Sequence, residues 1–118
     1  MDNQIIIEGK PVTLRFFTVK DKIDIDQLQR HSVLLDAQIK GLTNELDIVQ
    51  KENERMDLMW KKYFKILTSG TSLSKEEIES LTGNKVDELL ITVLEYNKPP
   101  LELQERLSTL SMPDSTQK

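Results

Sequence analysis

One stretch decides the fold of this chain: residues 25–67, IDQLQRHSVLLDAQIKGLTNELDIVQKENERMDLMWKKYFKIL. Apolar side chains recur in it every seven positions, at Leu28, Leu35, Leu42, Val49, Met56 and Tyr63. A second series lies three residues before or four after the first, at Ile25, Ile39, Leu46, Trp60 and Leu67. Such spacing is typical of the d and a positions of a heptad and predicts a long amphipathic helix. Ser32 and Asn53 fall on a positions, where a polar side chain costs stability but can fix register.

Gly41, Thr43 and Asn44 form the weak point of this helix. A glycine inside a helix costs about 1 kcal/mol relative to alanine, and Asn44 could cap a new helix. The heptad phase nevertheless passes through Gly41 without a skip. We therefore expect one continuous or merely bent helix over about 19–67, with residues 41–44 as the place where it would break. Unbroken, it would be about 70 Å long.

The heptad has two interpretations, which the residues leave open. It can be the seam of an intermolecular coiled coil, or the core of a helical hairpin within one chain. The short helices expected further along could cover only part of it. The length of seam left over favours self-association, so we expect a homo-oligomer.

The segment before the long helix predicts a β-hairpin over residues 4–17. QIIIE (4–8) is rich in β-branched residues, Gly9-Lys10 can turn, and VTLRFF (12–17) alternates apolar and polar side chains. Thr18 and Asp21 then have the spacing of a capping box, which predicts the start of the helix. An isolated hairpin is marginal in water, so this one must dock on helices or on another subunit.

The segment after the long helix predicts a loop over 68–74 and several short helices. Ser74 and Glu77 form a second capping box for a helix that ends at Gly83, and Asn84 can cap the next, over 85–97. A last helix is expected over 101–110. The fold class is thus mainly α with a short N-terminal β-hairpin. It forms a single domain, 1–110, with a helical C-terminal part, 75–110, and a flexible tail, 111–118.

Composition narrows the classes of function. The chain has 118 residues, a net charge of −4 and no cysteine. An acidic balance disfavours nucleic acid as a partner, and no apolar run is long enough for a membrane span. The single His31 has no second imidazole near it, so we expect no metal site. We find no catalytic or cofactor-binding motif, and we expect a non-enzymatic protein that acts through protein contacts.

Aromatic side chains alternate with lysines in WKKYFKIL, residues 60–67. This pattern could bind single-stranded nucleic acid by stacking, but its i, i+3, i+4, i+7 spacing favours the apolar face of a helix. Aromatic anchors of this kind are good hot spots for a protein partner. From the periodicity we predict two sets of interaction residues. Leu28, Leu35, Trp60, Tyr63 and Phe64 would contact a partner helix, and Phe16 and Phe17 would dock the hairpin.

The order of the blocks IEGKPVTLRFFTVKD and SLSKEEIESLTGNKVDELLITVLEYN resembles the small tail assembly chaperones of long-tailed bacteriophages. The similarity covers most of residues 5–97. It rests on a strand–Gly–Lys–strand segment with TLR, on TVKD, and on the later VDELL block. It implies a chaperone in the cytoplasm of the bacterial host cell, one that binds the tape-measure protein, keeps it soluble and helps recruit tail-tube subunits. The alternative is a coiled-coil structural or adaptor subunit, such as a virion or baseplate component, that self-associates through the heptad helix.

Overall fold

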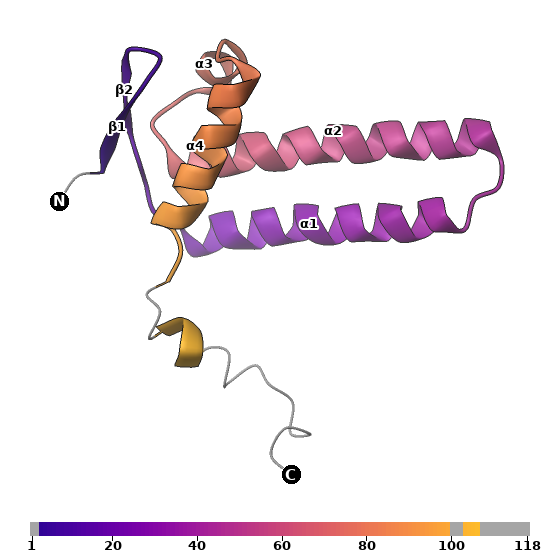
Figure 1. Ribbon diagram of the computed structural model, residues 1–118. Coiled ribbons are helices and arrows are strands. Elements are labelled where there is room, and N and C mark those ends of the chain that lie inside the picture. The colour runs from indigo at the N-terminus through magenta and orange to yellow at the C-terminus, as the bar shows by residue number, and fades with distance from the viewer. Residues whose placement is uncertain (1–2, 100–102, 107–118) are drawn as a thin grey trace.

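The computed structural model of the protein describes residues 3–99 and 103–106 and shows a small head with a long two-helix stem (Figure 1). The elements are β1 (Gln4–Ile7), β2 (Lys10–Thr13), α1 (Val19–Lys40), α2 (Glu45–Gly70), α3 (Lys75–Glu79) and α4 (Gly83–Tyr96). We call α1 together with α2 the stem. The head consists of the hairpin, α3, α4 and the last turns of α2. The expected mainly helical fold with an N-terminal hairpin is confirmed. Of the helix expected over 101–110, residues 103–106 are helical; the rest of it and the tail 111–118 lie outside the described residues.

The helix expected over 19–67 is not continuous, and the chain turns back at residues 41–44, the place where a break was expected. The backbone N–H of Gly41 donates to the carbonyls of Gln38 and Ile39 and closes α1. The side-chain oxygen of Asn44 then accepts from two backbone N–H groups, those of Leu46 and Asp47, and opens α2. The two helices have 22 and 26 residues, or about 33 and 39 Å each. Gly41 as C-cap and Asn44 as N-cap therefore break the helix, although the heptad spacing continues through residues 41–44.

The hairpin turns at Glu8-Gly9, one residue earlier than expected. Both residues have positive φ, 48° and 81°, which is the backbone of the two-residue turns that suit the twist of a hairpin. Ile7 pairs with Lys10 and Ile6 with Pro11. Because the residues next to the closing pair of a two-residue hairpin form a non-hydrogen-bonded pair, the missing N–H of Pro11 leaves no gap in the ladder.

The strand expected to run to Phe17 ends at Thr13, because the chain leaves β1 for a new partner. The backbone N–H of Arg15 donates to the carbonyl of Gly70 at 2.7 Å, and that of Ser72 donates to the carbonyl of Thr13 at 2.9 Å. Further on, the side-chain oxygen of Asn97 accepts from the backbone N–H of Phe17 at 2.8 Å. The hairpin is thereby fastened to the ends of both α2 and α4.

The hydrophobic core lies in the head. Its buried side chains are Ile7, Val12, Leu14, Ile66, Leu67, Leu73, Ile78, Val86, Leu89, Leu90 and Val93. Outside this cluster, Leu35 and Leu58 are the only buried apolar side chains among the described residues. Since apolar burial is the main favourable term in folding, the head supplies most of the stability and the stem contributes much less.

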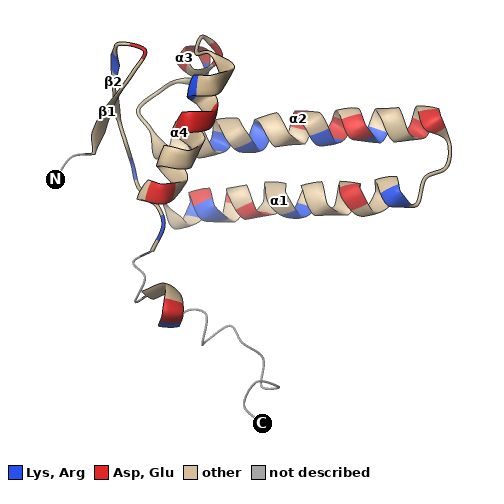
Figure 2. Ribbon diagram, viewed as in Figure 1, with Lys and Arg blue, Asp and Glu red and all other residues tan. Residues whose placement is uncertain are grey.

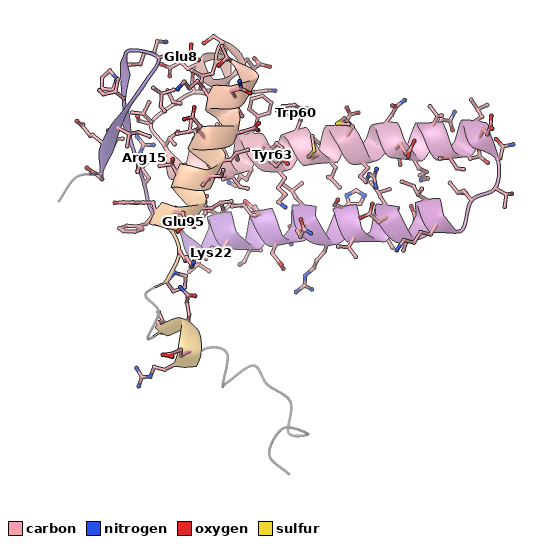
Figure 3. All side chains as sticks on the ribbon, in the orientation of Figure 1. Glu8, Arg15, Lys22, Trp60, Tyr63 and Glu95 are labelled. Atoms are coloured by element: carbon pink, nitrogen blue, oxygen red, sulfur yellow. The ribbon has the colours of Figure 1, made fainter. Side chains whose placement is uncertain are left out.

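The start of α4 differs from the expected one. α3 ends at Glu79 rather than at Gly83, and Thr82 rather than Asn84 is the N-cap of α4. Thr82 donates from its backbone N–H and its hydroxyl to the Glu8 carboxylate, at 3.1 and 3.2 Å. Glu8 lies at the tip of the hairpin, beside the start of α4 (Figure 3). A carboxylate from the turn thus supplies the acceptor and the negative charge that favour a helix N-terminus.

Both predicted capping boxes are confirmed, at Thr18/Asp21 and at Ser74/Glu77. The Asp21 carboxylate does more than cap α1, because it also accepts from the Lys65 ammonium and the Ser69 hydroxyl of α2, each at 3.2 Å. The pKa of Asp21 is lowered to about 2, although burial raises it. The main cause is the hydrogen bond from the backbone N–H of Thr18, followed by side-chain hydrogen bonds with Lys65, Thr18 and Ser69. Asp21 therefore ties the base of α1 to α2.

We expect Asp21→Asn to lower the free energy of unfolding at pH 6 by about 1–2 kcal/mol. The folded pKa lies below the ordinary value of 3.8, so this stability is present above about pH 4 and is lost as the pH falls towards 2. Urea unfolding at pH 6 and pH 2 should show a difference between variant and parent at the higher pH only. Asp47→Asn is the matched control, because Asp47 lies in the first turn of α2 and is exposed. An equal loss in both variants, or a loss that persists at pH 2, would contradict the assignment.

Candidate functional site

The two helices of the stem meet through a polar seam. On α2 the residues that face α1 are at positions 48, 51, 55, 58, 62 and 65, of which four are basic. Arg55 binds Asp36, Lys62 donates to Gln29, and Lys65 binds Asp21 and Asp24. Charged residues of both signs accordingly lie along both helices (Figure 2). Leu58 is buried in this seam, and it lines the same hollow as Leu35.

The heptad residues of α2 between Leu46 and Trp60 lie on the opposite side of that helix and are exposed, whereas Tyr63 and Leu67 are covered by the head. Leu46, Val49, Met56 and Trp60 are 67%, 51%, 53% and 44% exposed, and Asn53 lies among them. At 3.6 residues per turn, these positions point nearly opposite to the six that face α1. We call Leu46, Val49, Asn53, Met56 and Trp60 the α2 stripe. In α1, by contrast, the heptad residues face α2 and are buried or half-buried. The helical hairpin thus uses only the α1 half of the heptad.

The α2 stripe ends in an aromatic cluster at the head. Trp60 meets Tyr63 edge-on, with ring centroids 5.7 Å apart, and lies 6.3 Å from Phe64. Tyr63 and Phe64 are half-buried against the core, and the Lys75 ammonium lies 5.3 Å from the centre of the Phe64 ring. Trp60 stands on the side of α2 away from α1 (Figure 3). One end of the stripe is therefore a large aromatic side chain held in place by the head.

The structure brings together three of the predicted interaction residues and separates the other four. Trp60, Tyr63 and Phe64 form the aromatic cluster. Leu28 is half-buried and lines a hollow between α1 and α2, whereas Leu35 is buried in the seam, so a partner does not reach Leu35 while the stem is closed. Phe16 is exposed and stacks on Tyr96, with centroids 4.5 Å apart, and Phe17 is half-buried against the core. Leu46, Val49, Asn53 and Met56 were not predicted as contact residues. The three apolar ones are heptad positions, so the periodicity could have identified them.

A second apolar surface lies beside α4. A hollow of about 430 Å³ between α1, α2 and α4 is lined by Ile25, Lys62, Tyr63, Ile66, Asp87, Leu90, Ile91 and Leu94. Ile91 and Leu94 are 64% and 49% exposed. The hollow is open and mostly apolar, with one lysine and one aspartate as its charged groups. It is suited to accept an apolar side chain, but it is shorter than the α2 stripe and has no repeat.

The described part of the chain offers little for chemistry. No group of three or more His, Asp or Glu side chains in it could hold a metal ion, and His31 is exposed. No helix of residues 3–99 and 103–106 is both long and apolar enough to cross a membrane. Two serine hydroxyls near the start of α3 have structural roles. That of Ser74 caps α3, and that of Ser72 accepts from the backbone N–H of Thr13.

Comparison of the chain with protein-family models, with curated proteins and with solved structures gave no match. The surface of the structure is therefore the basis for a functional assignment. Its most distinctive surface is the α2 stripe, an apolar heptad that residues 3–99 and 103–106 leave uncovered.

Proposed function

We propose that the protein is a non-enzymatic tail assembly chaperone of a long-tailed bacteriophage, acting in the cytoplasm of the host cell. It binds a helical segment of the tape-measure protein on the α2 stripe and keeps that client from aggregating. The observation that supports this most directly is the orientation of α2. Between Leu46 and Trp60 its heptad residues are turned to solvent, whereas its contacts with α1 are mostly polar, with Leu58 as the buried apolar one.

The geometry of the stripe suits a helical client. A stripe with a 3.5-residue period matches a partner helix that has the same period, because knobs from each helix then fit holes in the other. From Leu46 to Trp60 it extends for about 21 Å, or two heptads. A contact of this size is expected to be weak and reversible, as a chaperone needs if it is to release its client during assembly.

The hairpin offers a separate place for the tail-tube subunits. Residues 70–72 cover the outer edge of β2 near its end, but among the described residues no strand pairs with the outer edge of β1. Ile6 on β1 is 69% exposed. An open strand edge with an exposed apolar side chain can add a strand from a partner. We propose this edge as the contact with a tail-tube subunit.

The second candidate is a coiled-coil structural or adaptor subunit that remains in the particle. The same heptad favours it, since Asn53 at an a position could set the register of a homo-oligomer. Self-association through the stripe is its prediction, and light scattering at several concentrations measures it. Detection of the protein in purified mature particles would also favour this candidate.

Co-expression tests the chaperone proposal. The tape-measure protein of the same phage is expressed with and without this chain, and its soluble fraction is compared. We expect the client to be soluble only in the presence of the chain, and mass spectrometry to find no chain in mature particles. A client that is equally soluble without it, or a stoichiometric amount in the particle, would refute the proposal.

A further inference from the structure

We infer that the helix bound by the α2 stripe is basic along both edges of its own apolar stripe. This rests on the proposed function, which has the α2 stripe bind a helix, and it adds the chemistry that selects that helix. The observation behind it is the charge of the residues that flank the stripe. In a coiled coil these are the e and g positions, which set the choice of partner.

The flanks of the α2 stripe are acidic. Because Leu46, Asn53 and Trp60 hold a positions, the g positions along the stripe are Glu45, Glu52 and Met59, and the e positions are Gln50 and Asp57. Met59 is half-buried, and the other four side chains are exposed. None of the three carboxylates has an ion-pair partner within 4.0 Å among the described residues. An exposed apolar stripe thus runs between two edges that hold three negative charges and no positive one.

The basic residues of α2 are occupied elsewhere. Four of the five bind side chains of the stem: Lys51 to Glu54, Arg55 to Asp36, Lys62 to Gln29, and Lys65 to Asp21 and Asp24. Arg55 does act on Glu52 through its charge, but its guanidinium is bound to Asp36, and this hydrogen bond is the main cause of its raised pKa. Lys61 lines the hollow between α1 and α2 together with Asp57, and it holds a b position, outside the e and g flanks of the stripe. The carboxylates of Glu45, Glu52 and Asp57 therefore remain available for ion pairs with a partner.

A second copy of the chain fits this stripe poorly. In a parallel pair, Glu52 of one α2 would face Asp57 of the other across the seam. In an antiparallel pair, g positions face g positions and e positions face e positions, so these flanks meet only acidic or neutral side chains, and Glu52 faces Glu52 in the register centred on it. Both arrangements place like charges together, which disfavours the pair. A helix with lysine or arginine at its e and g positions would instead form attractive pairs along both edges.

Two synthetic helices of about three heptads test the inference. Both have leucine and isoleucine at the a and d positions and no tryptophan; one has lysine at every e and g position, the other glutamate. Trp60 is the only tryptophan of the chain and lies in the stripe, so its fluorescence reports binding at this site. We expect the basic peptide to shift the Trp60 emission to the blue and to bind at least about tenfold more tightly than the acidic one. High salt should reduce this preference.

Charge reversal supplies the matched comparison. Glu52→Lys with Asp57→Lys should reverse the preference, so that the acidic peptide binds better. Glu79→Lys with Glu95→Lys changes the net charge equally at exposed positions away from the stripe and should leave the preference unchanged. Three results would overturn the inference: equal binding of both peptides, the same effect from both charge reversals, or binding without a change at Trp60. Dimerisation abolished by Val49→Gln with Met56→Gln would overturn it as well, because the occupant would then be a second copy.

Failure of this inference and failure of the proposed function are distinguishable. If the chain keeps its client soluble and the Glu52→Lys/Asp57→Lys variant does so equally well, the chaperone proposal stands and the charge selection is refuted. If the client is soluble without the chain, the chaperone proposal is refuted whichever peptide binds.

Discussion

Gly70→Ala is expected to destabilise the protein by about 2–3 kcal/mol, which corresponds to a fall in Tm of about 10 °C. Gly70 is the last residue of α2 and is buried. A Cβ built on it would overlap Cγ1 of Val93 and lie 3.1 Å from Cε1 of Phe17. Val93 is fully buried in α4, so neither side chain can move aside without opening the head. Thermal unfolding followed by circular dichroism measures the effect.

Gly83→Ala is the matched control for Gly70→Ala. Gly83 is the first residue of α4, and no atom lies within 4 Å of the position that its Cβ would take. The control should be neutral, or more stable by a few tenths of a kcal/mol, because alanine restricts the unfolded chain. In the Gly70→Ala background, Val93→Ala removes the overlapping atom and should cost less than it does in the parent. A Tm for Gly70→Ala within 2 °C of the parent would show that α4 does not pack this closely on α2.

The local signals in the sequence predicted the fold well. Both capping boxes, the helix-starting Asn44 and the hairpin are made by residues within a few positions of one another, so the sequence contains the whole interaction. The errors concern contacts between distant residues. Thr82 caps α4 with the carboxylate of Glu8, which is 74 residues away. α2 continues through Gly70 because α4 packs there, although the composition of residues 68–74 is that of a loop.

The period of the heptad was predicted correctly, but the expectation that it runs through one continuous helix was wrong. Periodicity shows which residues share a face of a helix, but not what lies opposite that face. Once the chain turns at Gly41, the α1 half of the heptad faces α2, and the α2 residues from Leu46 to Trp60 face away. The polar contacts that orient α2, such as Arg55 with Asp36, join residues on different helices. Of the candidate site, the aromatic cluster was therefore foreseen, but the exposure of the stripe was not.

Two glutamine variants, a double one on the exposed face of α2 and a single one on the face towards α1, are expected to have opposite consequences. Val49→Gln with Met56→Gln alters exposed side chains, so the free energy of unfolding should change by less than about 0.5 kcal/mol for each. Binding of the partner helix should weaken about a hundredfold, because two apolar anchors are lost from the seam. Titration of Trp60 fluorescence and thermal unfolding of the same sample measure both quantities.

Leu58→Gln is the counterpart on the face towards α1. Leu58 is 6% exposed, so the variant loses apolar burial and places an amide in the seam without a partner, at a cost of about 3 kcal/mol. We expect the Tm to fall by about 10 °C or more, whereas any variant that remains folded keeps its stripe and its affinity. If the Leu58 variant loses binding while folded and the stripe variant does not, the binding face of α2 is the one that meets α1. The partner would then have to open the stem, and its contacts would include Leu28 and Leu35.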